Sequence, residues 1–193
     1  MRERRILWER PVERLWAPWR MGYILGEQPA GCVFCVKPRE AQDVQNYILG
    51  RSQNCYLILN IFPYNNGHLM VVPYAHVATL DELDAEVLTD LMVMAQRTMR
   101  VMRELMHPDG FNVGLNIGRS AGAGIDEHLH LHVVPRWNGD TNFMPVLGDT
   151  KIIPQSLQAC YELLAPAVQA IAPSPAPAGT RRARRATRRG GPW

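Results

Sequence analysis

The chain has 193 residues, 47% hydrophobic and 20% charged, which is enough for one buried core and predicts a single folded domain. Its net charge is +3, but six arginines lie between positions 181 and 189, so the remainder carries −3, which excludes a basic nucleic-acid surface on the folded part. No run of about 18 apolar residues is present, which excludes a membrane-spanning helix.

The N-terminal region lacks the apolar stretch of a secretory signal, so we expect a cytoplasmic protein whose four cysteines stay reduced. Residues 1–12 are expected to form an arm. The following LWAPWRMGYI at positions 15–24 has two tryptophans and is expected to wrap onto the domain. Next come Cys32 and Cys35, whose spacing in a reducing compartment favours metal binding or redox chemistry over a structural disulfide. Such a pair supplies half of a tetrahedral zinc site.

The middle of the chain alternates strand-like and helix-like patterns. Short apolar runs at 55–62 and 67–74 flank PYNN and predict two strands joined by a turn. The spacing of apolar residues over 79–106 predicts a long helix with one buried face. Thr79 and Glu82 form a capping-box pattern at its start, and Pro108 and Gly110 mark its end.

Two more strands and a second helix are predicted in the C-terminal half. The strands, at 111–118 and 127–136, are separated by the Gly-rich loop RSAGAGID, and residues 153–171 have helical spacing with Pro154 near the first turn. The pattern predicts an α+β fold, with an antiparallel sheet of about five strands and two main helices on one face. The domain is expected to span residues 13–171. Residues 172–193 are rich in Pro, Ala and Arg and are expected to form a disordered tail, for which contact with nucleic acid is the less favoured reading.

Three histidines, His128, His130 and His132, occupy every second position of the last predicted strand. Alternate side chains of a strand share a face, so these three point one way while the intervening leucines point into the core. With a rise of about 3.4 Å per residue, the outer Cα atoms lie roughly 13–14 Å apart, too far for all three to bind one ion. The spacing predicts a division of labour, and the alternative is a strand with solvent-facing histidines.

The stretch HLHLHVV at positions 128–134 resembles the signature of the histidine triad superfamily of nucleotidyl transferases and hydrolases. The resemblance covers most of residues 13–170, and its matching stretches are WAPWR at 16–20, CVFC at 32–35, PYNNGHLMVVPYAH at 63–76 and PRWNGDTNFMP at 135–145. Pro135 and Arg136 resemble the branch that cleaves dinucleoside polyphosphates. His132 differs from the branch that carries Gln at that position.

The resemblance implies a two-step mechanism in which His130 attacks the α-phosphorus and water or orthophosphate then releases the nucleotide. It implies that His68 orients the nucleophile, whose second ring nitrogen should be held by an acceptor such as a backbone carbonyl. His132 would donate to the phosphoryl oxygens. The resemblance also implies four contacts with substrate: Asn60 to the ribose, Asn116 to the phosphate or leaving group, the loop at Ala123 and Gly124, and Trp137. Either Asn could instead be a turn or strand-end residue, and Trp137 could be a core or interface residue.

A structural zinc site is implied by several bacterial members of the same family. Its ligands here would be Cys32, Cys35, His76 and His128, and the chemical step itself would require no cofactor. Unmetallated cysteines are the alternative.

The expected function is therefore transfer or hydrolysis of a nucleotidyl group from a dinucleoside polyphosphate, by a homodimer or homotetramer. The residues do not decide whether orthophosphate or water accepts the nucleotidyl group. Two other classes also stay open, a metal-dependent phosphohydrolase that uses two of the three histidines as ligands and a non-catalytic nucleotide-binding protein.

Overall fold

The computed structural model describes residues 31–148 and 150–172, which belong to one compact unit. The expected arm at 1–12, the WAPWR stretch and all but the first residue of the expected tail lie outside the described residues. In the part of the chain that is described, no helix is long and apolar enough to cross a membrane.

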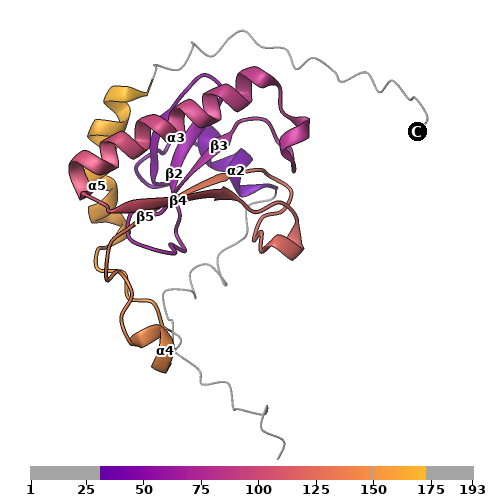
Figure 1. Ribbon diagram of the computed structural model, residues 1–193. Coiled ribbons are helices and arrows are strands. Elements are labelled where there is room, and N and C mark those ends of the chain that lie inside the picture. The colour runs from indigo at the N-terminus through magenta and orange to yellow at the C-terminus, as the bar shows by residue number, and fades with distance from the viewer. Residues whose placement is uncertain (1–30, 149, 173–193) are drawn as a thin grey trace, which may run out of the picture. The chain divides into compact units, whose positions relative to one another are not determined.

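A five-stranded antiparallel sheet forms the centre of the unit (Figure 1). Its strands are β1 (Ile48–Arg51), β2 (Cys55–Leu59), β3 (Leu69–Pro73), β4 (Gly110–Leu115) and β5 (Leu131–Arg136). Their order across the sheet is β1-β2-β3-β5-β4, so β5 lies between β3 and β4. The predicted α+β fold with about five strands is confirmed.

Two long helices, α3 (Ala85–Met106) and α5 (Leu157–Ile171), cover one face of this sheet (Figure 1). The shorter helices are α2 (Val33–Val36) and α4 (Met144–Gly148), with 3-10 turns η2 (Lys37–Arg39), η3 (Leu80–Glu82) and η4 (Arg119–Ala121). The core between the long helices and the sheet includes Leu57, Val71, Met94, Leu131 and Leu164, all at most 3% exposed. Burial of this apolar surface is the main force that holds the layers together.

Both long helices begin later than their sequence pattern predicted. The backbone N–H of Thr79 donates to the Glu82 carboxylate over 3.0 Å, as in a capping box, but it caps the short η3 turn. Leu83 is then extended, and α3 starts at Ala85. At α5, Ser156 is the N-cap and its Oγ accepts from the Ala159 N–H over 3.2 Å, so Pro154 lies before the helix.

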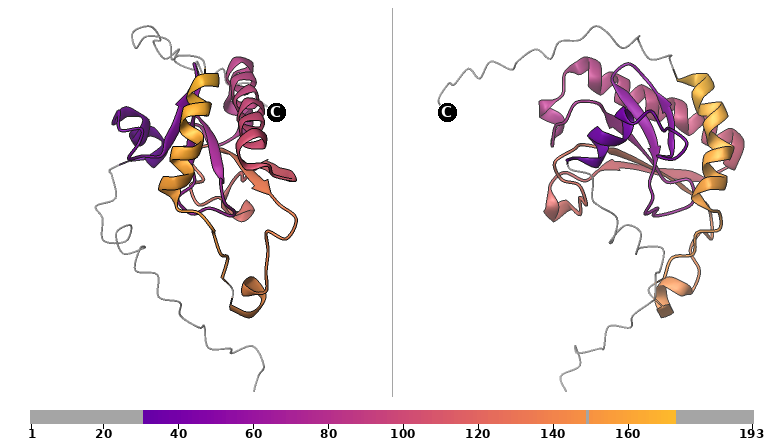
Figure 2. Two further views of the ribbon diagram at one scale, coloured as in Figure 1. Left: turned by 90° about the vertical axis from the view of Figure 1, so that its left-hand side faces the viewer. Right: turned by 180° about the vertical axis from the view of Figure 1, so that it is seen from behind.

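The opposite face of the sheet has its own apolar cluster, made by Phe34, Ile48, Tyr56, Ile58, Met70 and Val72. Phe34 comes from α2, which lies across the sheet from α3 (Figure 2, left). Met70 pairs with His132 in the β3–β5 ladder, and directly opposite residues share a face. The histidines therefore belong to the face that α2 approaches.

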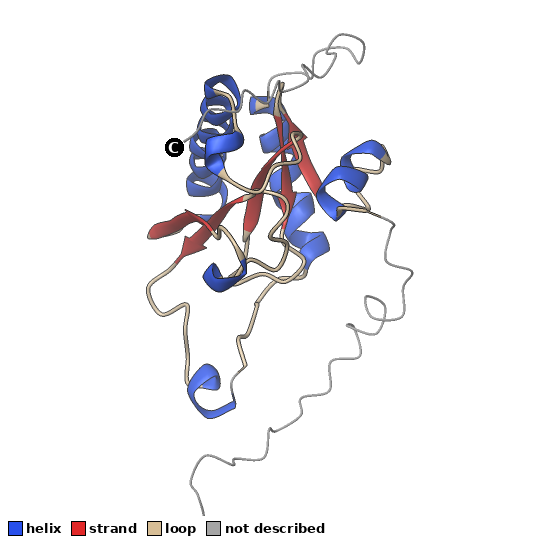
Figure 3. Cartoon of the chain, turned by 90° about the vertical axis from the view of Figure 1, so that its right-hand side faces the viewer, coloured by secondary structure: helices blue, strands red, loops and turns tan. Residues whose placement is uncertain are grey.

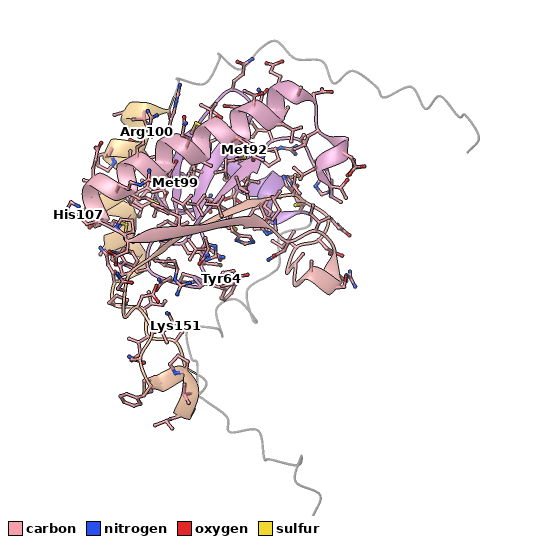
Figure 4. All side chains as sticks on the ribbon, in the orientation of Figure 1. Tyr64, Met92, Met99, Arg100, His107 and Lys151 are labelled. Atoms are coloured by element: carbon pink, nitrogen blue, oxygen red, sulfur yellow. The ribbon has the colours of Figure 1, made fainter. Side chains whose placement is uncertain are left out.

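Residues 141–148 and 150–152 belong to an arm that carries α4 away from the sheet (Figure 3). Lys151 holds the base of the arm, where its Nζ donates to the Asp140 backbone oxygen over 2.6 Å (Figure 4). The arm exposes four large apolar side chains, Phe143, Val146, Leu147 and Ile152, at 65%, 82%, 76% and 50%.

Candidate active site and metal centre

The three alternating histidines are buried, although only one of them lies in a strand. β5 begins at Leu131, so the predicted start at residue 127 is wrong and His128 and His130 precede the sheet. Their exposures are 1% for His128, 6% for His130 and 8% for His132, which excludes the solvent-facing alternative. Leu131 and Val133 point into the core beneath the helices, as the alternation predicted.

His130 has one ring nitrogen committed and one free. Its Nδ1 lies 2.7 Å from the backbone oxygen of His128, which can only accept, so Nδ1 carries the proton and donates. Burial lowers the pKa of His130 below its ordinary value, so the ring is neutral near pH 7. The lone pair of a neutral imidazole is then on Nε2, where it is available to attack an electrophile.

A chain of hydrogen bonds fixes the tautomers of the other two histidines. The Tyr64 backbone N–H donates to Nδ1 of His68 over 2.9 Å, so the proton of a neutral His68 is on Nε2. That Nε2 lies 2.9 Å from Nδ1 of His132 and donates to it. His132 must therefore carry its own proton on Nε2. Among the described residues, this Nε2 is the one buried side-chain nitrogen or oxygen without a hydrogen-bond partner.

His68 and His132, the two histidines joined by these hydrogen bonds, are neutral over a wide pH range. Burial, with a smaller contribution from His132 and His130, lowers the pKa of His68 to about 3. Burial and then His130 lower the pKa of His132 to about 4. The site thus presents one N–H donor, at His132, beside one free lone pair, at His130, and the two rings lie 4.8 Å apart between centroids.

His68 is placed differently from the expectation that it orients the nucleophile. Its ring nitrogens are used by Tyr64 and His132, and the carbonyl that holds His130 belongs to His128. His68 thus bonds the ring of His132, which in turn lies beside His130, and a part for His68 in orienting the nucleophile stays a prediction.

Asn60 and Tyr64 form the wall of the site beside His68. Asn60 Oδ1 accepts from the Phe62 N–H over 2.9 Å, so the amide shapes the turn that follows β2. The Tyr64 ring is 55% exposed and lies 4.5 Å from the His68 ring and 5.6 Å from the His132 ring between centroids. Figure 4 shows Tyr64 on the other side of the sheet from the labelled α3 residues Met92 and Met99.

The predicted phosphate loop follows β4, and β4 pairs with β5, the strand that carries His132. Asn116 comes two residues after Gly114, which pairs with His132 in the β4–β5 ladder. The loop turns at Gly118 and Gly122, whose φ values of 79° and 87° favour glycine. Ala123 is half-buried and Gly124 is exposed, so backbone in this segment is accessible to a ligand.

The contacts that the structure describes for Trp137 are with residues other than the histidines. Its indole N–H donates to the Met106 backbone oxygen over 3.1 Å, at the C-terminal end of α3. The ring lines a cavity of about 530 Å³ together with Asn65, Leu105, Ile152 and Leu163. The geometry thus gives Trp137 a hydrogen bond to the end of α3 and a place in the cavity wall, and its contact with substrate stays a prediction.

Cys32, Cys35, His76 and His128 come together, as the resemblance implied. Their ligand atoms all lie within 4.8 Å of one another. Nδ1 of His128 lies 3.3 Å from Cys32 Sγ, 3.5 Å from Cys35 Sγ and 3.2 Å from Nδ1 of His76. Zn–S bonds of about 2.3 Å and Zn–N bonds of about 2.0–2.1 Å in a tetrahedron require similar separations, about 3.3–3.6 Å.

The surroundings of the cluster also fit a metal. Nε2 of His128 lies 2.9 Å from the Pro73 carbonyl oxygen, so it donates and leaves Nδ1 free to bind an ion. The Tyr56 hydroxyl donates to the Phe34 carbonyl over 2.8 Å, which fixes the turn between the two cysteines. The donor set of two thiolates and two imidazoles is that of a structural zinc site.

Several residues of the site carried no signal in the sequence. Phe34 contacts the rings of His128 and His130 at 5.5 and 4.9 Å between centroids. Asn65 donates to the Asp140 carboxylate over 2.7 Å and so ties the turn before His68 to the segment after β5. The position of Asn65 in PYNNGH was the one available hint, because an Asn side chain in a tight turn often makes hydrogen bonds that hold the turn.

The fold and site together define an α+β protein with three buried histidines, one of which keeps a free ring nitrogen, and a Cys2His2 cluster on one sheet face. Comparison with known proteins gives the family. The HIT domain profile matches residues 41–139. A protein of Mycobacterium tuberculosis named AP-4-A phosphorylase is 42% identical over 162 residues, which cover 80% of this chain and 83% of the relative.

Solved structures agree with this match. A Zn-bound histidine triad family protein from Mycobacterium smegmatis is 31% identical, with a TM-score of 0.59, and the match covers 72% of this chain and 93% of that one. A hypothetical histidine triad nucleotide-binding protein from Sulfolobus tokodaii is 30% identical, with a TM-score of 0.56 and coverage of 71% and 89%. The chain belongs to the HIT domain family.

Proposed function

We propose that the protein transfers a nucleotidyl group from a dinucleoside polyphosphate, such as diadenosine tetraphosphate, through a covalent intermediate on His130. The observation that carries the proposal is the pairing of a free Nε2 lone pair on His130 with an unpartnered Nε2–H on His132. The likeness to a protein named AP-4-A phosphorylase supports the class of substrate.

In the first step, Nε2 of His130 attacks the α-phosphorus of the substrate. The new N–P bond forms as the bond from the α-phosphorus to the bridging oxygen breaks, and that oxygen leaves with its electron pair. With diadenosine tetraphosphate the leaving group is ATP and adenylyl-His130 remains. The Nδ1–H bond to the His128 carbonyl stabilises the positive charge that develops on the ring.

In the second step an acceptor attacks the same phosphorus and restores the free imidazole. Water gives AMP, whereas orthophosphate gives ADP. In both steps negative charge grows on the phosphoryl oxygens. The Nε2–H of His132 is held in place by His68 and Tyr64, so it stabilises this charge without having to reorganise.

Incubation with diadenosine tetraphosphate, with and without orthophosphate, tests the proposal. ADP plus ATP identifies phosphorolysis, and AMP plus ATP identifies hydrolysis. The His130→Asn variant should fold normally and lose about 10³-fold or more in turnover. Turnover by this variant near the wild-type rate would exclude the covalent mechanism. Tight binding of adenine nucleotides by the wild type, with no turnover of any dinucleotide, would identify a binding protein.

We also propose that the Cys32, Cys35, His76 and His128 cluster holds a structural zinc ion. Zinc supplies a crosslink here, because four protein ligands leave no open position for substrate. His130 and His132 stay outside this ligand set, which disfavours a metal-dependent hydrolase that uses them as ligands. Bound zinc requires reduced thiols and therefore fits the cytoplasm.

We propose, finally, that the protein self-associates through the β4 edge of the sheet. Within the described residues β4 pairs with β5 alone. The exposed side chains of Val113, at 42%, and Ile117, at 39%, lie on or just after this edge strand. An exposed apolar edge strand is a template for pairing with another chain.

A further inference from the structure

Phe34 connects the metal cluster to the nucleophile. It stands between Cys32 and Cys35 in the sequence, and its side chain is 5% exposed. The ring centroid lies 4.9 Å from that of His130 at an interplanar angle of 46°, and 5.5 Å from that of His128 at 67°. One side chain therefore contacts both a ligand of the cluster and the imidazole that carries the reaction.

The backbone around Phe34 makes few hydrogen bonds to the sheet, although its ring packs in the apolar cluster with Tyr56 and Met70. Within α2, the Cys35 and Val36 N–H groups donate to the Cys32 carbonyl over 2.9 and 3.0 Å, which closes a single turn. This turn has no strand ladder with the sheet, among the described residues. The turn is attached to the sheet by the hydrogen bond from the Tyr56 hydroxyl to the Phe34 carbonyl. The contacts of the two cysteines with His76 and His128 attach it as well.

His130 needs a contact of this kind. A single hydrogen bond, from Nδ1 to the His128 carbonyl, fixes the tautomer but leaves the ring free to tilt about that bond. Two neighbouring rings limit the tilt, that of His132 at 4.8 Å and that of Phe34 at 4.9 Å. The direction of the Nε2 lone pair decides whether attack on phosphorus is in line.

We propose that Phe34 is a positioning residue for His130, and that closure of the Cys2His2 cluster fixes the backbone turn from which its ring reaches that histidine. The inference deepens the proposed function and rests on it for its kinetic readouts. The cluster then has two routes to the nucleophile, the carbonyl of His128 and the ring of Phe34. Metal binding orders the reacting nitrogen although the metal is not part of the reaction.

Phe34→Leu tests the proposal, with Val36→Ala as the matched control in the same turn. Leucine keeps an apolar side chain but removes the flat ring, whereas Val36 lies in the same turn and has no ring to lose. Metal content, thermal unfolding, kcat and KM are measured for both holo variants. Phe34→Leu should keep one zinc per chain and lose about 10- to 100-fold in kcat with KM within about twofold of wild type.

The control should match the wild type in kcat. A purely structural Phe34 would lower thermal stability and leave kcat of the folded protein unchanged, which would overturn the proposal. A Phe34 that binds the nucleobase would raise KM at constant kcat, and this outcome would also overturn it.

A second experiment removes the metal with a chelator at a temperature below unfolding of the metal-free protein. Wild type should lose much of its kcat, and Phe34→Leu should lose a clearly smaller fraction, because only the route through the His128 carbonyl is left to break. Equal fold losses in both proteins would mean that the metal and the ring act independently, which contradicts the proposal.

The ¹⁵N and ¹H NMR signals of the His130 ring provide a readout that does not depend on activity. Holo wild type should give one sharp Nε2 resonance, and holo Phe34→Leu and metal-free wild type should give broadened or multiple resonances. If wild type turns over no dinucleotide, the proposed function fails while this spectrum still tests the positioning. Identical sharp spectra in all three samples would overturn it.

Discussion

At the scale of single residues, the site depends on which nitrogen of each histidine carries a proton. The backbone N–H of Tyr64 cannot change its role as donor, so it fixes His68, and His68 in turn fixes His132. Substitution of His132 tests this directly. His132→Phe should lower kcat by about 10²–10³-fold, the usual loss for one transition-state donor. His132→Gln, which keeps an N–H group, should recover part of it.

The comparison is made from kcat of the two variants at equal metal content, with circular dichroism as the check on folding. Equal activity of the Gln and Phe variants would show that donation by this side chain does not matter.

The same histidines make stability depend on pH. In the folded protein the pKa values of His68 and His132 are about 3 and about 4, whereas the ordinary value is 6.5. Below pH 6.5 the unfolded chain therefore binds more protons, so the free energy of unfolding falls as the pH drops from 6.5 towards 4. We expect a loss of at least about 1 kcal/mol between pH 7 and pH 5.

Urea unfolding at pH 7, 6 and 5 measures this loss. His132→Phe, which removes one of the two titrating groups, should show a flatter dependence than the wild type. A dependence as steep as that of wild type would assign the pH effect to other groups.

The sequence revealed only part of the site at this scale. The alternation of His128, His130 and His132 with apolar residues was enough to predict a shared face and a division of labour. Phe34 and Tyr64 gave no such signal, because an aromatic residue beside a Cys-x-x-Cys pair or in a turn is compatible with many roles. Their contacts with the histidines depend on chain segments that meet only in the folded protein.

At the scale of elements, the metal cluster joins the short helix α2 to the segment before β5. Cys32 and His128 are 96 positions apart, and a crosslink closing a loop of about 100 residues is worth about 4.7 kcal/mol in the chain-entropy model. One kcal/mol shifts Tm by about 2–4 °C in a chain of this size. Removal of the metal should therefore lower Tm by roughly 9–19 °C.

Differential scanning calorimetry with and without EDTA measures the shift, and Cys35→Ser should reproduce most of it without a chelator. Loss of activity that zinc reverses, without any change in Tm, would instead favour a metal-dependent reaction.

Two Arg–Asp pairs of similar geometry should differ in their contribution to stability. The carboxylate of Asp140 is 7% exposed and accepts from Arg136, Asn65 and the Trp137 backbone over 2.6–3.2 Å. Its hydrogen bond with Arg136 holds the pKa of Asp140 well below the usual range. The Arg119–Asp126 pair is largely exposed on the arginine side.

Asp140→Ala leaves the buried amide of Asn65 with one acceptor fewer and should cost about 2–3 kcal/mol, whereas Asp126→Ala should cost much less, because solvent screens the exposed pair. Chemical denaturation of the two variants decides between them. Equal costs would show that the three-way contact of Asp140 adds nothing to an ordinary surface pair.

The start of β5 shows why the boundaries of elements were harder to predict than their existence. The pattern EHLHLHVVPR is strand-like from its first residue, yet the ladder begins at Leu131. The Leu129 N–H donates instead to Val77, and His128 reaches the carbonyl of Pro73, where β3 ends. These contacts take residues 128–130 out of the sheet, and no local pattern encodes them.

At the scale of the whole molecule, association through β4 is expected to determine the oligomeric state. Val113→Lys places a charge on the exposed edge and should shift the protein towards the monomer in analytical ultracentrifugation. Val146→Lys on α4 is the matched control, because Val146 is also apolar and even more exposed, at 82%. If the control dissociates the protein and Val113→Lys does not, the arm and not the sheet edge forms the interface.

The fold class was predictable from the alternation of strand and helix patterns, and so was the placement of the two long helices on one face. The strand order was not, because sequence neighbours β4 and β5 pair while β5 also inserts beside β3. The arm at 141–152 was also missed, since its sequence reads as part of a family motif and its projection depends on the Lys151 contacts at its base.

The position of β5 has a consequence for synthesis on the ribosome. Within the described residues β4 has β5 as its strand partner, and β5 emerges after it. A nascent chain that ends at residue 115 has β1, β2 and β3 available for pairing, but β4 must wait for about 20 more residues, roughly 1–4 s at usual elongation rates. His128, which completes the cluster, emerges in the same interval. The sheet, the Cys2His2 cluster and the ring of His130 are thus completed within one short interval of synthesis.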